Sequence, residues 1–178
     1  MKGSATSQYW SGLSRLIDSI NNGFQQNFEL YITGATHGEQ MYQQSFVKLV
    51  GKLSEENLDA LCNEVDLGVS NLANYLIHFN QTTNMKSREY YARGLPFIQS
   101  NSMPDIDGLP EEKYFLRLPN NASLIDMNLV RDFALKMRAD SNHPKEMRIF
   151  AKKQLDWNIK MQELKKILEK EFVAESAK

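Results

Sequence analysis

The clearest pattern of the chain lies in residues 54–79, SEENLDALCNEVDLGVSNLANYLIHF. Its apolar stripe consists of Leu58, Leu61, Val65, Val69, Leu72, Leu76 and Phe79. These side chains recur at steps of three and four, which places them on one face of an α-helix. Ser54 stands in front of two glutamates, and a serine N-cap with acids in the first turn stabilises a helix start. The stretch therefore predicts a long helix that ends in the polar run at 80–84.

The same spacing continues on both sides of this stretch. It predicts helices over residues 8–31, 39–53 and 87–93, a helix capped by Ser123, and a last helix over 144–174. Ser7 is the expected N-cap of the first of these, and Gly94 is the expected stop of the short one. No run alternates with the period of two that a half-buried strand would have. Helices are therefore expected along most of the chain.

Prolines and glycines interrupt the helical pattern between residues 94 and 121. Four of the five prolines lie there, namely Pro96, Pro104, Pro110 and Pro119. Long regular structure cannot pass through them, so an irregular loop is expected, with a short helix opening at Pro110 and a strand over 113–118 as the alternative. The predicted fold is all-α: an irregular bundle of five or six helices with a long proline-containing loop and a long C-terminal helix.

The composition is that of one globular domain. The 178 residues are enough for a core, and we expect a flexible N-terminus over 1–7 and a single helical domain over 8–178. The net charge of −1 gives no overall field toward nucleic acid or membrane. Cys62 is the only cysteine, and neither a signal peptide nor a membrane-spanning run is recognisable. These features predict a cytoplasmic protein that is not in a membrane.

Residues that could bind a metal ion are scattered. His37, His78 and His143 lie far apart, whereas a zinc site needs clustered ligands. The acidic run at 104–112 is interrupted by Ile106 and Pro110, unlike a calcium-binding EF-hand loop. There is also no glycine-rich phosphate loop. The sequence therefore predicts no metal and no cofactor, and no small-molecule ligand is evident from it.

Arg138 and His143 are separated by four residues. This spacing is similar to the motif of the HEPN ribonucleases, which are all-helical and act as dimers that pair two motifs. The resemblance covers six residues and implies that the guanidinium stabilises a phosphorane while the imidazole moves a proton. It departs from the family pattern at Ala139, where a polar residue is common. A metal-independent ribonuclease is therefore an alternative function.

A second alternative is a nucleic-acid-binding accessory subunit. Residues 131–170 hold 11 basic and six acidic residues, and residues 88–93 interleave aromatic with basic side chains. The candidate contacts are Arg88, Tyr90, Tyr91, Arg93, Lys145, Arg148, Lys152 and Lys153.

The last predicted helix is the main candidate for binding a partner. At 1.5 Å per residue it would be roughly 45 Å long, which exceeds the span of a compact domain of this size. Its main stripe includes Trp157, Met161, Leu164 and Leu168. Soluble monomers rarely expose large apolar patches, so part of the stripe is expected to meet another chain. The leading hypothesis is therefore a non-enzymatic interaction protein, an adaptor or small subunit that binds a protein partner or itself.

Overall fold

The computed structural model describes residues 11–34, 42–82 and 84–176, with side chains through residue 170, and the statements below concern these residues. The protein is a mixed α/β structure with 52% helix and 12% strand, arranged around two small parallel sheets. The prediction of an all-α helical bundle is therefore wrong. The expected N-cap at Ser7 and the expected flexible segment 1–7 lie outside the described residues.

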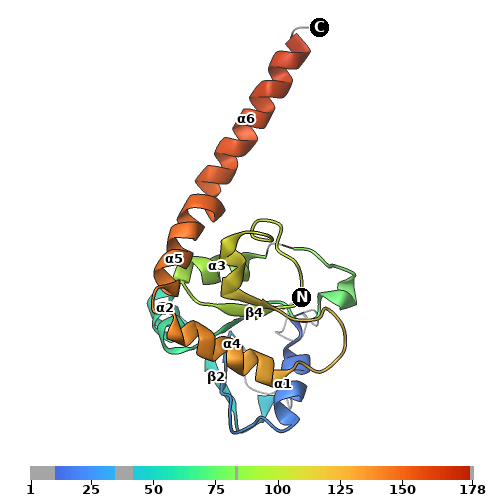
Figure 1. Ribbon diagram of the computed structural model, residues 1–178, viewed down its shortest axis with the longest axis vertical. Coiled ribbons are helices and arrows are strands. Elements are labelled where there is room, and N and C mark those ends of the chain that lie inside the picture. Colours follow the sequence, from blue (N-terminus) through green and yellow to red (C-terminus); the bar gives the residue numbers. More distant parts are fainter. Residues whose placement is uncertain (1–10, 35–41, 83, 177–178) are drawn as a thin grey trace.

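The larger sheet forms the centre of the fold (Figure 1). It contains β3 (Gly68–Val69), β4 (Phe97–Gln99) and β5 (Phe115–Arg117) in the order β3-β4-β5, and all neighbours are parallel. Phe97 is paired with Gly68 on one side and with Phe115 on the other. Every residue of β4 is buried, as in parallel sheets that are covered on both faces.

The smaller sheet pairs β1 (Leu30–Thr33) with β2 (Val47–Gly51), again in parallel. Both strands lie where helices were predicted, over 8–31 and 39–53. In the first segment only α1 (Leu13–Asn21) is helical, and Gly23 adopts a φ of 100° shortly after it. Residues 35–41, where the second predicted helix would begin, lie outside the described residues.

The remaining elements join and cover the strands. They are α2 (Glu55–Glu64), the 3₁₀ turn η4 (Asn74–Ile77), α3 (Met85–Arg93), the 3₁₀ turn η5 (Pro110–Tyr114), α4 (Met127–Ala139), α5 (His143–Phe150), the π-helical turn η6 (Ala151–Leu155) and α6 (Trp157–Ser176). The predicted helix over 58–79 is therefore wrong beyond Glu64, where the chain turns into β3.

Several local predictions are confirmed. Ser54 caps α2, because its side chain accepts a hydrogen bond from the Asn57 N–H at 3.3 Å. The short helix α3 ends at Gly94, whose φ of 72° is left-handed and therefore favours glycine. A side chain at this position would also meet the backbone of Pro144, whose carbonyl oxygen lies 2.6 Å from an ideal Cβ.

Segment 94–121 is not the irregular loop that its prolines predicted. It contains β4, η5 and β5, and among its side chains Met103, Ile106 and Tyr114 are completely buried. Pro110 is the first residue of η5, where a proline is tolerated, and the other three prolines stand between the elements, so none of them interrupts regular structure. The strand β5 lies within 113–118, where a strand was the less favoured alternative.

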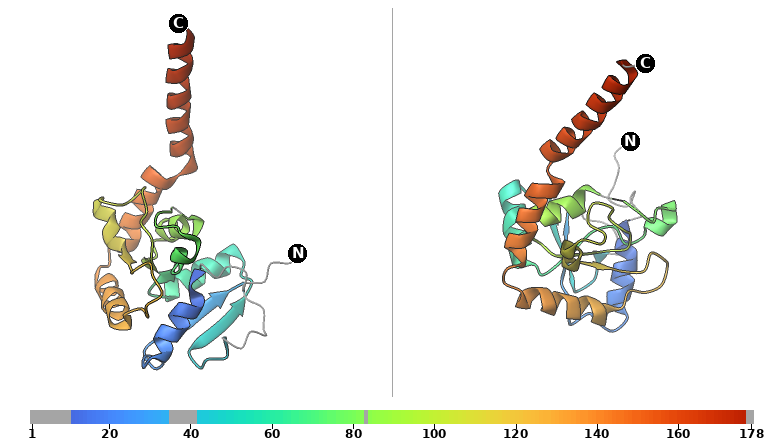
Figure 2. Two further views of the ribbon diagram at one scale, coloured as in Figure 1. Left: turned by 90° about the vertical axis from the view of Figure 1, so that its right-hand side faces the viewer. Right: turned by 45° about the horizontal axis from the view of Figure 1, so that its top comes forward.

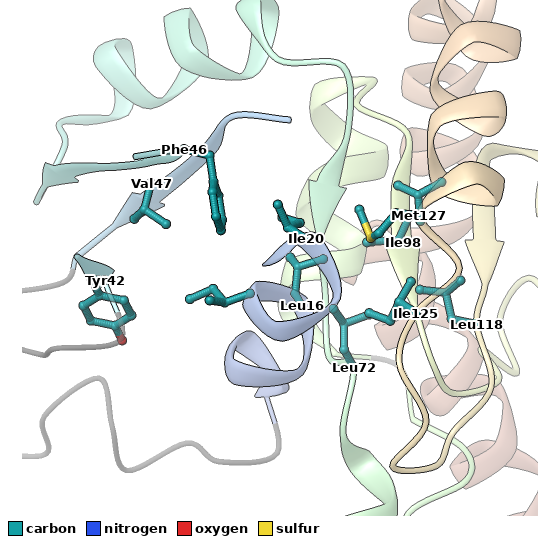
Figure 3. Packing of buried hydrophobic residues seen from close by; sticks show 12 residues of the cluster. Leu16, Ile20, Tyr42, Phe46, Val47, Leu72, Ile98, Leu118, Ile125 and Met127 are labelled. Carbon is teal, nitrogen blue, oxygen red and sulfur yellow. The ribbon is translucent and has the colours of Figure 1, made fainter. Parts of the chain in front are cut away.

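Two clusters of buried side chains hold the fold together. In the first, Leu16 and Ile20 of α1 lie between Phe46 and Val47 near the small sheet and residues such as Leu72 near the large one (Figure 3). The second cluster covers the opposite part of the large sheet. It contains stacked Phe97 and Phe115, with ring centroids 5.4 Å apart, and the buried faces of α3 and α5. The first cluster makes α1 the connection between the two sheets.

The C-terminal helix was predicted as one element, but it consists of three. A π-helical turn follows α5, and Asp156 is extended before α6 begins at Trp157. Buried Phe150 and Leu155 anchor the first two pieces. In contrast, α6 runs away from the body as a rod (Figures 1 and 2).

Candidate ligand site at the carboxyl edge of the large sheet

Polar residues follow the ends of the two strands β3 and β4. Ser70 comes directly after β3, Gln99 is the last residue of β4, and Ser100 and Asn101 follow it. All four side chains are buried. The carboxyl ends of parallel strands meet at one edge of a sheet, and open α/β sheets bind ligands in the crevice outside that edge. This edge is therefore the candidate site.

Hydrogen bonds link the two strand ends to the first turn of α3. The Ser87 hydroxyl lies 2.9 Å from the Ser70 hydroxyl and donates to Oε1 of Gln99, also at 2.9 Å. Asn84 donates to the Ser70 hydroxyl at 2.9 Å, and its Oδ1 caps the helix by accepting from the Ser87 N–H at 2.9 Å. The network thus fixes the N-terminus of α3 against the ends of β3 and β4.

Asn101 holds the segment that connects β3 to α3. Its Oδ1 accepts from Nδ2 of Asn74 at 2.8 Å, and its Nδ2 donates to the Thr82 carbonyl at 2.9 Å. Oδ1 of Asn74 is buried without a hydrogen-bond partner among the described residues. Such an atom costs free energy unless water or a ligand satisfies it.

Lys86 lies in the first turn of α3 and is half-buried. Burial lowers the pKa of its ammonium group. Among the described residues Lys86 has neither a hydrogen-bond partner nor a carboxylate within salt-bridge distance. The first N–H groups of a helix also lack intrahelical acceptors, and the helix dipole makes this end positive. The first turn of α3 therefore combines the Lys86 ammonium with the positive end of the helix dipole, and no carboxylate of the described residues pairs with Lys86.

A second buried cation reaches the same segment from α1. Arg15 is only 7% exposed, and its guanidinium donates to the carbonyls of Leu72 at 2.6 Å and Ser123 at 2.7 Å. The Nη2 atom of Arg15 is buried without a hydrogen-bond partner among the described residues. Burial also lowers the pKa of the Arg15 guanidinium. Leu72 is two residues beyond Ser70, so Arg15 and the start of α3 hold neighbouring parts of one segment.

Arg138 and His143, the predicted ribonuclease pair, each have a partner of their own. Two nitrogens of Arg138 donate to Asp66 at 2.6 and 2.9 Å, and this arginine is exposed. His143 Nδ1 lies 2.6 Å from the Asp140 carbonyl, at the start of α5. The pair therefore lies at the α4–α5 boundary, and the guanidinium binds Asp66, two residues before β3 begins.

The basic–aromatic segment is engaged within the fold. Tyr90 and Tyr91 donate to the carbonyls of Val69 and Glu111 at 2.9 and 2.8 Å. Arg88 pairs with Asp105 at 2.5 Å, and Arg93 pairs with Glu55, Asp59 and Glu89. The four side chains therefore lie on α3 with contacts to several elements rather than forming one open surface.

The other predicted contacts lie on the C-terminal elements. Lys145 and Arg148 are exposed on α5, where Arg148 also donates to the Arg93 carbonyl at 2.7 Å, and Lys152 and Lys153 are exposed on η6. Trp157, Met161, Leu164 and Leu168 are exposed on α6.

A cavity of about 450 Å³ lies between α2, α3 and α5. Cys62, Asp59, Glu89 and Arg93 contribute to its wall, and burial raises the pKa of the Cys62 thiol. Arg93 is already paired with the acids that surround it. The cavity therefore offers less unpaired charge than the carboxyl edge.

The residues of this edge were missed as site residues in the sequence. A signal was present, because Ser70-Asn71 and Ser100-Asn101 both follow short apolar stretches. It becomes meaningful only once those stretches are known to be neighbouring parallel strands.

Comparison of the chain with protein-family models, with curated proteins and with solved structures finds no match. None of the helices in the described part of the chain combines the length and apolar character needed to cross a membrane. Within the same residues, no three His, Cys, Asp or Glu side chains gather in a way that could hold a metal ion.

Proposed function

We propose that the carboxyl edge of β3 and β4 binds an anionic small molecule and that a phosphate group of this ligand sits at the first turn of α3. The observation that carries the proposal is Lys86, which is half-buried at a helix N-terminus and has no acid beside it among the described residues. Phosphate groups are favoured at helix N-termini because first-turn N–H groups and the helix dipole both attract negative charge. Asn84 already accepts from the Ser87 N–H, so here the dipole and the Lys86 ammonium supply most of the attraction.

Arg15 adds to the positive charge near this edge. A buried guanidinium without a carboxylate is costly, and an anion in its vicinity would lower that cost through the electrostatic field. The Ser, Asn and Gln side chains at the carboxyl edge are uncharged. They hold the backbone in place and do not neutralise Arg15 and Lys86. The arrangement therefore supports an anion rather than a cation or an uncharged ligand.

Apolar side chains on the neighbouring segments favour a ligand that also has a ring. Leu76, Phe79 and Met85 are exposed. Leu76 lies on η4, Phe79 two residues after its end, and Met85 at the first position of α3. Binding sites commonly combine apolar walls with a few fixed polar groups. A nucleoside diphosphate has both a charged group for Lys86 and a flat ring for such a wall, so it is the ligand class proposed.

Titration of the protein with pyrophosphate, ADP and UDP by calorimetry tests this function. Lys86→Met should weaken binding of all three by about tenfold or more, because it removes a charge-assisted hydrogen bond. The matched control is Lys153→Met, which removes an exposed lysine on η6 and should leave affinity unchanged. Equal affinities in the two variants, or no binding to the wild type, would contradict the proposal.

A protein-interaction role remains a second proposal for this chain. It is favoured by the apolar residues of α6, since Trp157 is 60% exposed and Leu164 is 46% exposed on a helix that leaves the body. The two proposals concern separate parts of the molecule and can both hold.

A further inference from the structure

Four apolar residues of α6 form a continuous exposed stripe, and the first of them, Trp157, also lies against the body, with the Arg88 guanidinium 5.9 Å from its ring centroid. Trp157, Met161, Leu164 and Leu168 follow one another at steps of four, three and four, the spacing of alternating a and d positions in a coiled coil. We call these four residues the α6 seam. The opposite side of the helix contains Ile159, which is half-buried. The four seam residues are 46–60% exposed, so a partner can reach them.

Lysines flank the seam on both sides. With Met161 at a and Leu164 at d, Lys160 takes a g position and Lys165 takes an e position. The acids with described side chains, Glu163 and Glu169, fall at c and b, farther from the seam. Over residues 157–170, two of the four e and g positions are therefore lysine, the other two are Asn158 and Ile167, and none is acidic.

The existing contacts of these lysines leave them free to exchange partners. Lys165 lies 3.7 Å from Glu169, and Lys160 lies 3.3 Å from Glu163 and 3.6 Å from Asp105. The Lys165–Glu169 pair is solvent-exposed, whereas Lys160 is half-buried and shared between Glu163 and Asp105. Pairs within a helix at such positions contribute only a few tenths of a kcal/mol. A partner carboxylate can therefore replace or join them.

A second copy of α6 does not match this pattern of charges. In a parallel pair, a g position faces the following e position of the other helix, so Lys160 would face Lys165. In an antiparallel pair, e positions face e positions and g positions face g positions, so Lys165 would face Asn158 or Lys165, and Lys160 would face Ile167 or Lys160. Neither arrangement of residues 157–170 brings an acid to either lysine.

We infer that the α6 seam docks an amphipathic helix of a different protein, with apolar residues at its own a and d positions and acidic residues at e and g. This inference rests on the second proposed role and names the chemistry of the partner. Apolar burial along the seam would supply the attraction, and the flanking charges would select the partner.

Two synthetic peptides of three heptads test the inference on the full chain. Both have leucine at a and d, and one has glutamate while the other has lysine at e and g. In fluorescence anisotropy at low salt, the glutamate peptide should bind about tenfold more tightly, because several weak ion pairs replace repulsions. Salt at about 1 M should remove most of this preference.

Charge reversal provides the matched comparison. Lys160→Glu/Lys165→Glu should reverse the preference in favour of the lysine peptide, whereas Lys166→Glu/Lys170→Glu makes the same charge change away from the seam and should preserve it. Leu164→Glu should abolish binding of both peptides. All these positions are solvent-accessible on α6, and circular dichroism checks that each variant is folded.

Other outcomes separate the inference from the role on which it rests. Equal binding of both peptides would contradict the inference that the partner helix is acidic, but it would be consistent with the proposed protein-interaction role. Binding of neither peptide would count against both. A dimer in sedimentation that Leu164→Glu dissolves would identify a second copy as the occupant. If the protein binds vesicles of phosphatidylcholine and phosphatidylserine, and Leu164→Glu abolishes this binding, the occupant of the seam would be a membrane surface instead.

Discussion

Lys86 shows how one residue can oppose folding and favour binding at the same time. Its ammonium is half-buried, burial lowers its pKa, and no acid among the described residues compensates for its charge. A residue that is kept at such a position has a local cost. Strain and unsatisfied charge of this kind cluster at functional sites, which is why the proposed ligand is placed there.

The cost can be measured through its pH dependence. Because the folded-state pKa of Lys86 lies below the unfolded value of about 10.4, the unfolded chain binds more protons between the two values, so stability rises with pH across that window. Lys86→Met should therefore be more stable than the wild type at neutral pH, with an advantage that shrinks as pH approaches 10. Urea unfolding at several pH values checks this, and Lys153→Met should show no such trend.

At the scale of elements, the N-cap residues of α2 and α3 contribute unequally to stability. Ser54 caps α2 in an exposed position, and α2 has no buried residue. Asn84 caps α3, but it also donates to Ser70 in the network that joins α3 to β3. The loss of Asn84 thus affects both a helix end and a buried polar group.

Asn84→Ala should consequently destabilise the protein more than Ser54→Ala. A lost cap costs about 1 kcal/mol, and the lost hydrogen bond to Ser70, whose hydroxyl keeps its contact with Ser87, adds about 0.5–1.5 kcal/mol. We expect about 2 kcal/mol for Asn84→Ala and about 1 kcal/mol or less for Ser54→Ala, measured from urea unfolding midpoints. Equal losses would mean that the buried network contributes little.

The elements that could be predicted are those with local signals. Ser54 and Gly94 mark a helix start and a helix end by capping alone, and both predictions are confirmed. The strands have only two to five residues. β4 is buried throughout, and β1 alternates in burial over just four residues, so neither gives a period-two signal long enough to recognise in the sequence. Leu72 and Phe79 continue the helical spacing by coincidence. Leu72 lies in the loop after β3, and Phe79 lies after η4.

The candidate site could not be predicted for a related reason. Ser70, Ser87 and Gln99 come from three elements and meet only because β3 and β4 are neighbours in a sheet that the sequence pattern did not reveal. Without the sheet, the polar residues between apolar stretches resemble ordinary turns. The amphipathic seam was found because its members are close in sequence.

At the scale of the whole molecule, the chain divides its apolar side chains between two purposes. The core clusters use residues from Leu16 to Leu155, and the seam of α6 contributes none of its four side chains to them. Among the described residues, the buried side chains of the two clusters end at η6. We therefore expect the stability of the fold to depend on the residues up to η6, and α6 to contact another molecule.

Two truncations test that division. Ending the chain after Met161 removes only exposed described side chains, so the free energy of unfolding should change by less than about 1 kcal/mol. Ending it after Arg148 also removes buried Phe150 and Leu155, which should cost about 4 kcal/mol or more and can abolish folding. The first truncation should nevertheless lose the glutamate peptide, because it lacks Leu164 and Leu168. If the protein that ends at Met161 unfolds, the seam belongs to the core of the fold and the interaction role is wrong.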